Sequence, residues 1–543
     1  MQTKNIKTNP FLDQKAGTSG LRKKVAVFQQ ADYLENYVQS IFDCLKEKQG
    51  KTLVIGGDGR FFNDQAIQII IKIAHANGFG ELLIGQNGLL STPAASHLIR
   101  HYKTLGGIIL SASHNPGGEK GDFGIKYNIS NGGPAPEKLT DKIYAQTKKI
   151  TNYKIAQCEP VDLNKIGTNM LGKMKITIID PVTDYANLME ELFDFDAIKT
   201  MFNNGFSLCF DSMHAINGPY AKAIFNNMLG APKSSLMNAT PLPDFGGLHP
   251  DPNLVHAKDL YNLMFSKNAP DFGAATDGDG DRNLIIGKDI FVTPSDSLAI
   301  LAANLHLIKG YKDGIKGIAR SMPTSMAADR VAQHLGVPIY ETPTGWKFFG
   351  NLLDDNRITI CGEESAGTGS NHVREKDGLW AVLAWLNILA MRKKSVKEIV
   401  QEHWGKFGRN YYTRHDYEEV DLNAANKLMK RLKEKLSSLV GSEVDGLEIS
   451  KADNFSYLDP IDSSLSQNQG IRIIFKNGSR IIIRMSGTGT IGATIRLYIE
   501  RYEAKSGKLF LNTQTALKQL IDIAKDISDI EEITGRNKPS VVT

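Results

Sequence analysis

The feature that most constrains the fold is a repeated alternation of short apolar runs with amphipathic helical patterns. Thr52–Ile55 is a short apolar run that predicts a strand. The segment after it places an apolar stripe on one helical face, formed by Ala66, Ile67, Ile70, Ile71 and Ala74. We expect Asn63 to cap this helix and Gly78 to end it. Similar rhythms restart at Ser207–Asp211 and at Gly317–Arg320, as is typical of α/β domains with partly parallel sheets.

The pattern changes after about residue 408. A polar helix is predicted over 423–436, followed by apolar runs at 470–475 and 480–485. The Asn477-Gly478 pair between these runs predicts a hairpin, because both turn residues tolerate positive φ. A further strand at 493–500 and a helix from about Thr515 complete a smaller α+β domain. No low-complexity linker separates the blocks, so we expect them to pack around a central cleft.

The fold class expected is therefore α/β, with three tandem α/β domains with mixed sheets and a smaller C-terminal α+β domain. The length of 543 residues agrees with several domains of about 100–200 residues each. We place the domains at residues 1–190, 191–294, 295–408 and 409–543.

Composition narrows the class of protein. The net charge of +5 falls short of the clustered basic surface of nucleic-acid binders, but it suits an anionic small molecule. The four cysteines are scattered and form no CxxC pair, so neither structural zinc nor a disulfide framework is expected. The longest apolar stretch, Leu379–Met391, is too short to span a bilayer and predicts a buried helix. The first residues contain no apolar core of a secretory signal. We expect a soluble, cytoplasmic protein with no nucleic-acid or membrane partner.

An acidic loop follows an apolar run that ends at Thr276. Asp277, Asp279 and Asp281 alternate with glycines, and their mutual repulsion is costly unless a cation neutralises it. Oxygen ligands of this kind suit Mg²⁺ or Ca²⁺. An EF-hand is excluded, because the sixth and twelfth positions hold Arg282 and Lys288 in place of Gly and Glu. We therefore predict a Mg²⁺ site that can engage a substrate phosphate, with Arg282 steadying the same anion; a solvated acidic turn is the alternative.

A serine loop follows the run Gly106–Leu110. Ser113 is followed by His-Asn-Pro-Gly-Gly, a rigid turn on which a hydroxyl can be presented. No GxSxG motif is present, which argues against an α/β-hydrolase nucleophile. Lys126 is a nearby basic group that could assist proton transfer. The alternative is that Ser111 and Ser113 only satisfy backbone groups of the turn and that Lys126 is solvated.

Two more loops carry polar side chains. Gly487, Gly489 and Gly492 spell GxGxxG after a strand, but a strand pattern follows where the dinucleotide fingerprint needs a helix. We predict a phosphate cradle there, flanked by Arg484 and Arg496, with a plain turn as the alternative. The loop 362–370 offers carboxylates and hydroxyls suited to a sugar, although it could be a surface loop only.

Taken together, the four loops resemble those of the α-D-phosphohexomutase superfamily, specifically its phosphoglucomutase family. The resemblance runs from the segment Gly17–Arg22 to the C-terminal phosphate loop. SASHNPGG is similar to the phosphoserine loop, DGDGDR to the metal loop, GEESAGTGS to the sugar loop and RMSGTGT to the phosphate loop. The chain departs from common relatives at Ser111, Ala366 and Asn371, none of which supplies a reacting group.

The resemblance implies roles for particular residues. Ser113 would carry the phosphoryl group, and Mg²⁺ would bind Asp277, Asp279, Asp281 and the phosphate on Ser113. Sugar hydroxyls would bind Glu363 and Ser365. The distal phosphate would bind a set from the last domain: Arg484, Ser486, Gly487, Thr488, Thr490 and Arg496. The remaining substrate contacts would come from Arg22, Asp281, Arg282, Thr344 and Lys376.

The activity implied is the interconversion of glucose 1-phosphate and glucose 6-phosphate, with glucose 1,6-bisphosphate as intermediate or activator. A general base must accept the proton of the sugar hydroxyl, and His114, Lys126 and Lys376 are the candidates. The alternatives are a mutase of broader specificity that also uses mannose phosphate, a sugar phosphatase, and a non-catalytic scaffold relative. We expect hexose phosphates as partners and a monomer or weak dimer.

Overall fold

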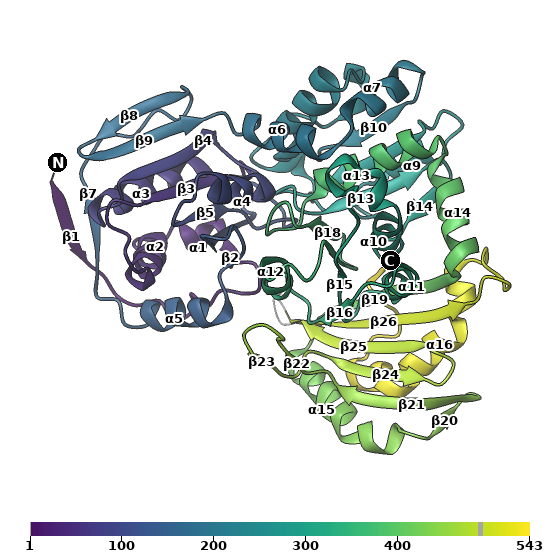
Figure 1. Cartoon of the computed structure of the whole chain (residues 1–543). Coiled ribbons are helices and arrows are strands. Elements are labelled where there is room, and N and C mark those ends of the chain that lie inside the picture. Colours follow the sequence, from purple (N-terminus) through teal and green to yellow (C-terminus); the bar gives the residue numbers. More distant parts are fainter. Residues whose placement is uncertain (1, 487–491) are drawn as a thin grey trace. The chain divides into compact units, whose positions relative to one another are not determined.

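The computed structural model describes residues 2–486 and 492–543 (Figure 1). Its contacts divide the chain into two compact units. Unit 1 comprises Met1–Pro294, Asn304–Ile315 and Gly345–Lys397. Unit 2 comprises Ser295–Ala303, Lys316–Thr344 and Glu398–Thr543.

Unit 1 begins with a mixed seven-stranded sheet in the order β2-β6-β5-β3-β4-β9-β8. Its parallel centre consists of β5 (Gly106–Leu110), β3 (Thr52–Gly57), β4 (Glu81–Leu89) and β9 (Met174–Ile179). The antiparallel flanks are β2 (Leu21–Lys24), β6 (Asp122–Ile129) and β8 (Gly167–Leu171). A separate antiparallel pair joins β1 (Thr3–Lys7) to β7 (Asn152–Ala156). The helices are α1 (Val25–Phe28), α2 (Tyr33–Cys44), α3 (Asn63–Ala76), α4 (Thr92–His101) and α5 (Glu137–Thr147).

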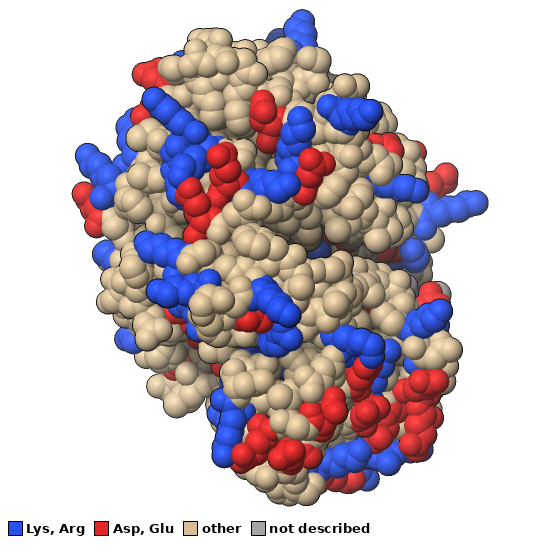
Figure 2. All heavy atoms as spheres, turned by 90° about the vertical axis from the view of Figure 1, so that its right-hand side faces the viewer, with Lys and Arg blue, Asp and Glu red and all other residues tan. Residues whose placement is uncertain are grey.

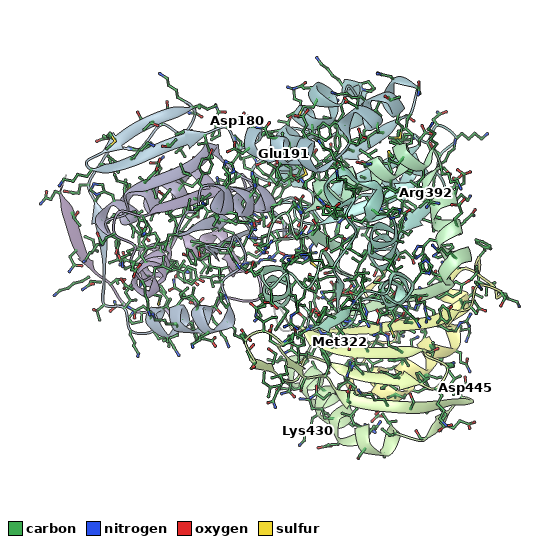
Figure 3. All side chains as sticks on the ribbon, viewed as in Figure 1. Asp180, Glu191, Met322, Arg392, Lys430 and Asp445 are labelled. Carbon is green, nitrogen blue, oxygen red and sulfur yellow. The ribbon has the colours of Figure 1, made fainter. Side chains whose placement is uncertain are left out.

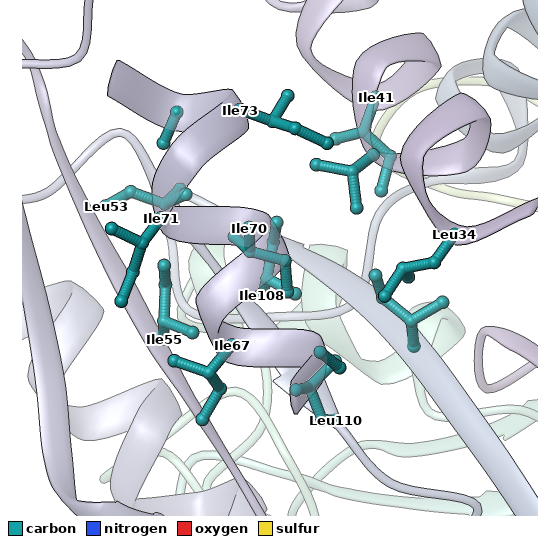
Figure 4. Close-up of a cluster of buried hydrophobic side chains, with 14 of the residues drawn as sticks. Leu34, Ile41, Leu53, Ile55, Ile67, Ile70, Ile71, Ile73, Ile108 and Leu110 are labelled. Atoms are coloured by element: carbon teal, nitrogen blue, oxygen red, sulfur yellow. The ribbon is translucent and has the colours of Figure 1, made fainter. Parts of the chain in front are cut away.

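A layer of isoleucines and leucines joins α2 and α3 to one face of this sheet (Figure 4). Ile67, Ile70 and Ile71 of α3 are fully buried there with alternate residues of β5, Ile108 and Leu110. The intervening residues of a strand point to the opposite face. Helix α4 lies on that face, since a side chain added at Gly107 would meet Ile99 of α4. The sheet is therefore covered on both faces, as a parallel centre requires.

The predicted cap of α3 is wrong. The residue that precedes the helix is Phe62, which has a left-handed φ of +77°, and Asn63 is the first helical residue. The side chain of Asn63 is held away from the capping position, because its Nδ2 donates to the carbonyl of Gly88 at 3.1 Å. The end of the helix agrees with the prediction, because Ala76 is its last residue and Gly78, just past the end, has the left-handed φ of +83° that terminates a helix.

The second α/β segment of unit 1 contains a five-stranded sheet in the order β11-β10-β12-β13-β14. The strands are β10 (Leu208–Asp211), β11 (Leu236–Met237), β12 (Phe272–Thr276), β13 (Asn283–Gly287) and β14 (Ile290–Val292). The segment begins just after Asp180, which is labelled in Figure 3 next to the helix 183–192. Its helices are α6 (Thr183–Leu192), α7 (Phe195–Asn203), α8 (Asn217–Ala221), the π-helix η1 (Lys222–Met228), the 3₁₀ turns η2 (Lys233–Ser235) and η3 (Phe245–Gly247), and α9 (Lys258–Met264).

The third α/β segment begins with α10 (Pro294–Asn304) and contributes to both units. In unit 1, β17 (Ile360–Glu363) pairs antiparallel with β18 (Gly367–Ser370). In unit 2, β15 (Ile318–Ser321) pairs parallel with β16 (Ile339–Thr342). The helices and turns are η4 (Leu305–Leu307), η5 (Lys309–Tyr311), α11 (Ala327–Leu335), α12 (Lys347–Asp354), α13 (Gly378–Arg392) and α14 (Val396–Phe407). Helix α13 is buried along nearly its whole length, which confirms the prediction of a buried helix.

Unit 2 ends with an antiparallel sheet in the order β20-β21-β24-β25-β26-β19-β27. Its strands are β19 (Arg409–Val420), β20 (Glu443–Val444), β21 (Leu447–Asn454), β24 (Ile471–Phe475), β25 (Arg480–Ser486), β26 (Ala493–Glu503) and β27 (Val541–Val542). A small pair, β22 (Tyr457–Leu458) with β23 (Leu465–Ser466), stands beside it. The helices α15 (Leu422–Leu439), α16 (Thr513–Ser528) and α17 (Ile530–Thr534) share one apolar core with the sheet. The hairpin β24–β25 is confirmed, with Gly478 at φ +82° in its turn.

These elements confirm the predicted fold class of three α/β segments with mixed sheets followed by a different C-terminal domain. Within the described ranges, every helix is too short or too polar to cross a bilayer. Lys and Arg side chains are interspersed with Asp and Glu over the face that Figure 2 shows.

Candidate active site

Ser113 lies on the turn that follows β5, and its backbone has a left-handed φ of +52°. This conformation is uncommon for a residue other than Gly, and such strain clusters at functional sites. The turn is held from within, because the Ser113 amide donates to the Ser111 hydroxyl at 2.7 Å. The Ser111 hydroxyl in turn donates to a carboxylate oxygen of Asp58 at 2.6 Å. The serine is therefore presented on a braced turn.

A buried ion pair between Arg60 and Asp58 supports the same turn. Arg60 binds Asp58 through Nε and Nη2, at 2.9 Å each, and both side chains are inaccessible to solvent. Arg60 also donates to the carbonyl of Ser113 at 2.7 Å. Burial raises the pKa of Asp58 above its ordinary value, although Arg60 opposes the shift. Sequence reasoning missed this pair; its signal was the charged GGDGR segment at the end of a buried strand.

The aspartate loop between β12 and β13 meets the serine turn. The Ser113 hydroxyl donates to Asp277 Oδ2 at 2.8 Å. Asp277 Oδ1 accepts the backbone amides of Asp281 and Arg282, at 2.9 and 3.0 Å, which fixes the loop. Asp277, Asp279 and Asp281 are all buried, and one oxygen of each lies within 4.8 Å of the others. The two loops that the sequence singled out thus form one site.

The three aspartates fit a divalent metal ion. Within the described part of the chain, Asp279 Oδ1 and Asp281 Oδ1 are buried oxygens with no hydrogen-bond partner. Burial raises the pKa of Asp277 well above its ordinary value, and the charges of Asp281 and Asp279 raise it further. A cation bound to the three carboxylates would remove this repulsion, and hard oxygen ligands are those that Mg²⁺ prefers.

Two lysines face the same carboxylates. Lys126 Nζ lies 3.4 Å from Asp279 Oδ2 and 3.7 Å from Glu375 Oε1, and Lys376 Nζ lies 3.2 Å from Asp281 Oδ2. Burial alone would lower the pKa of Lys126, but Glu375 and Asp279 outweigh it and raise the pKa above its ordinary value. Lys126 is therefore held as an ammonium group. The third base candidate, His114, has Nδ1 3.4 Å from Ser113 Oγ.

Two other residues at the carboxylates were not predicted from the sequence. The Thr92 hydroxyl donates to Asp279 Oδ2 at 2.6 Å. Glu375, beside Lys126, accepts from the amide of Asn128 at 2.8 Å. Thr92 carries no local signal, whereas Glu375 stands in the charged run REKDG.

Two half-buried arginines, each with a buried Nε, complete a place for an anion. Arg22, on β2, is half-buried, and desolvation of its guanidinium lowers its pKa, with Arg282 and Arg60 among its charged neighbours. In the described ranges, Arg22 Nε and Arg282 Nε are buried donors without a hydrogen-bond partner. Arg282 Nη1 lies 3.7 Å from Asp251 Oδ1. Cationic donors left unpaired in the interior are costly, so a phosphate group here would satisfy them.

The predicted sugar loop is the turn between β17 and β18, and Arg282 forms an isolated β-bridge with Gly367 beside it. Glu363 is buried and accepts the backbone amide of Gly345 at 2.8 Å. Ala366 has a left-handed φ of +70°, and Ser365 is half-buried. The loop is therefore part of the site in unit 1. Thr344 belongs to unit 2, where its buried hydroxyl has no partner among the described residues.

The predicted phosphate cradle lies in unit 2. Arg484 of β25 and Arg496 of β26 are directly opposite each other in the sheet, and Ser486 ends β25. Arg484 Nε donates to the carbonyl of Gln469 at 3.1 Å, and Arg496 Nε lies 3.5 Å from Asp416 Oδ2. Gly487, Thr488 and Thr490 lie outside the described residues. Among the residues that the structure describes, strand β26 begins at Ala493, where a dinucleotide fingerprint would need a helix.

Three α/β segments with a serine turn, an aspartate loop and paired arginines define the class of phosphohexomutases. Family models agree along the chain: alpha/beta/alpha domains I, II and III of phosphoglucomutase/phosphomannomutase match residues 13–154, 183–289 and 294–407. The model of the phosphoglucomutase-1 C-terminal domain matches residues 409–540. The chain belongs to the phosphoglucomutase family of the α-D-phosphohexomutase superfamily.

Individual relatives are similar over their full length. A phosphoglucomutase of Rhizobium radiobacter is 63% identical over 540 residues, covering 99% of this chain and 100% of the relative. Phosphoglucomutase-1 of Bos taurus is 53% identical, covering 99% of both chains. The open-form crystal structure of the exocytosis-sensitive phosphoprotein pp63/parafusin, a phosphoglucomutase from Paramecium, matches with a TM-score of 0.92 and 52% identity, covering 100% of this chain and 99% of that one.

Proposed function

We propose that the chain is an isomerase that interconverts glucose 1-phosphate and glucose 6-phosphate through a phosphoryl group on Ser113. The observation that carries this proposal is the 2.8 Å hydrogen bond from Ser113 Oγ to the central aspartate cluster. The full-length relatives named phosphoglucomutase support the choice of glucose.

The reaction exchanges one phosphorus–oxygen bond for another. A sugar hydroxyl attacks the phosphorus on Ser113, the bond to Ser113 Oγ breaks, and the hydroxyl proton passes to a base. Glucose 1,6-bisphosphate results, and after it reorients, its other phosphate returns to Ser113 by the reverse step. Because the transition state is loose and anionic, positioning and charge neutralisation supply most of the catalysis.

Different groups of residues bind the two phosphates, the sugar hydroxyls and the metal ion. Arg22 and Arg282 bind the phosphate at the serine, while Glu363 and Ser365 orient sugar hydroxyls. A Mg²⁺ ion held by Asp277, Asp279 and Asp281 would offset negative charge on the transferring group. The phosphate not in transfer binds a second set in the last domain, namely Arg484, Ser486, Gly487, Thr488, Thr490 and Arg496. Thr344, from the preceding segment, makes a further substrate contact.

The test is Ser113→Ala in an assay that couples glucose 6-phosphate formation to a reporter, with glucose 1-phosphate and a trace of glucose 1,6-bisphosphate. We expect turnover to be abolished and intact-mass spectrometry to find no phosphoryl group on the variant. Ser463→Ala is the matched control, since Ser463 also has a left-handed φ, of +59°, but lies in the β22–β23 loop. Near-normal turnover by Ser113→Ala would eliminate Ser113 as the carrier.

Mannose 1-phosphate tests specificity in the same assay format. We expect a clear preference for glucose 1-phosphate, because the sugar loop with Glu363 and Ser365 begins with GEES, which resembles the loop of glucose-specific mutases. Equal kcat/KM for the two sugars would favour the broader phosphohexomutase alternative, and release of inorganic phosphate would favour a phosphatase.

A further inference from the structure

A buried chain of hydrogen bonds lies beside the site and has no part in the proposed chemistry. The Trp380 indole donates to the Tyr311 hydroxyl at 2.9 Å, and Tyr311 and Ser370 share a hydrogen bond of 2.5 Å. Ser370 Oγ lies 2.8 Å from His372 Nδ1. His372 Nε2 lies 2.9 Å from Asp377 Oδ2, and all five residues belong to unit 1.

The order Ser370, His372, Asp377 is that of a hydrolytic triad, but the burial rules out a nucleophile. Ser370 and Asp377 are 0% exposed and the His372 side chain is 1% exposed, so no substrate reaches the hydroxyl. The His372 ring is also stacked on the Trp380 indole, with ring centres 5.4 Å apart. A polar network this deep is retained only where every member is satisfied, and it then fixes one local conformation.

The directions of the hydrogen bonds fix the imidazole. Asp377 already accepts the Tyr185 hydroxyl at 2.7 Å and the Trp380 amide at 3.0 Å, so a carboxylate there can only accept from His372. Nε2 therefore carries a proton. In the neutral imidazole Nδ1 is then an acceptor, so the Ser370 hydroxyl donates to Nδ1 and accepts from the Tyr311 hydroxyl. The hydrogen bonds therefore all point in one direction, from Trp380 to Asp377, which is the N-cap of α13.

The His372–Asp377 bond closes a short loop whose interior residues enter the active site. Between its two ends stand Glu375 and Lys376, which face Lys126 and Asp281 respectively. Beyond the bond, the amide of Gly378 donates to the carbonyl of Gly280 in the aspartate loop at 3.1 Å. The network therefore fixes both the loop that carries Lys376 and its separation from the metal-binding aspartates.

We propose that His372 is a positioning residue, which sets Lys376 and Glu375 against the aspartate loop by clamping the segment 372–377. The proposal rests on the proposed function for its kinetic readout. Loss of the clamp shifts Lys376 by a fraction of its 3.2 Å distance to Asp281, and a displacement of about 1 Å can lower a rate by about 100-fold.

The test begins with His372→Ala and His372→Gln. We expect kcat of His372→Ala to fall by about 10- to 100-fold with a much smaller change in KM. Glutamine can donate to Asp377 and accept from Ser370, so His372→Gln is expected to recover most of the loss. His75→Ala, a half-buried histidine on α3 in the same unit, is the control and should keep wild-type kinetics. Equal losses in the alanine and glutamine variants would overturn the proposal.

A double-mutant cycle asks whether His372 acts through Lys376. If it does, adding His372→Ala to Lys376→Gln should lower the single-turnover rate by less than about twofold, because coupled residues are not additive. Full additivity would assign His372 a general structural role and refute the clamp. Inactive wild-type enzyme would instead count against the proposed function, so the two failures are distinguishable.

Discussion

At the scale of single residues, the aspartate loop shows that a cluster of charged side chains can be predicted from the sequence. Asp277, Asp279 and Asp281 alternate with glycines, so their convergence was predicted from spacing alone, and the structure brings one oxygen of each within 4.8 Å of the others. Burial raises the pKa of Asp277, and the charges of Asp281 and Asp279 raise it further, in line with the repulsion that motivated the prediction. Short-range patterns of this kind are accessible to sequence reasoning because the residues are neighbours in the chain.

The metal hypothesis makes a prediction for Asp279→Asn. Removal of one ligand charge should weaken Mg²⁺ binding and lower kcat, since the remaining set has two carboxylates in place of three. Titration of activity with Mg²⁺ measures the shift. Asp289→Asn, an exposed aspartate with a φ of +56°, serves as control. A wild-type rate that EDTA leaves unchanged would disprove the metal site.

Partners from distant segments were not predicted. Arg60 reaches the carbonyl of a residue 53 positions away, Thr92 an aspartate 187 positions away, and Asn128 a glutamate 247 positions away. Each of these contacts depends on how the loops fold back on one another. Nothing in the local pattern around Thr92 distinguishes it from a helix-start threonine, so its role needs coordinates.

At the scale of elements, strong periodic patterns were predicted well, and one helix start was predicted wrongly. The hairpin β24–β25 and the buried helix α13 agree with the sequence, because turn chemistry and apolar length specify them locally. The start of α3 does not. A polar contact with Gly88 attracts the Asn63 side chain away from the capping role that its residue type favours. Tertiary contacts thus override local preference at a helix end.

Helix α4 carries a pH-dependent contribution to stability. Burial, reinforced by the nearby His101, lowers the pKa of His97 from 6.5 to about 4. The unfolded chain therefore takes up a proton before the folded chain as the pH falls. Stability is lost between pH 6.5 and 4, by at most about 1.4 kcal/mol per pH unit.

Melting temperatures of wild type and His97→Gln at pH 7 and pH 5 measure this effect. The wild type should lose more on acidification, because glutamine does not titrate. Parallel losses in the two proteins would show that other groups account for the acid sensitivity.

At the scale of the whole molecule, the alternation of strands and helices specified the fold class, since each block must bury its sheet beneath helices. The boundaries at residues 190, 294 and 408, and the arrangement around a cleft, remain predictions. Contacts in the structure group the chain differently, with 316–344 joined to the last domain in unit 2. Chain order alone could not anticipate this, because units defined by contacts need not be continuous in sequence.

The last domain should act in substrate binding and leave the metal site unaffected. Arg496→Met removes a charge-assisted contact worth about 1.5–3 kcal/mol, so KM for glucose 1-phosphate should rise by about one to two decades. Mg²⁺ affinity should stay unchanged. Arg536→Met, an exposed arginine of the same unit, is the control. An unaltered KM, or binding of NAD by this domain, would contradict the phosphate cradle.

The left-handed backbone conformation of Ser113 lowers the stability of the fold at a position where the serine hydroxyl is needed for turnover. Glycine adopts this conformation without penalty, whereas an L-residue pays about 1–2 kcal/mol. Ser113→Gly should therefore unfold at higher denaturant concentration than Ser113→Ala, although both lack the hydroxyl and both should be inactive. Equal midpoints would mean that the turn relaxes in the variants. Selection for stability alone would favour glycine at this position. The serine is therefore present because turnover requires its hydroxyl, at a cost in folding stability.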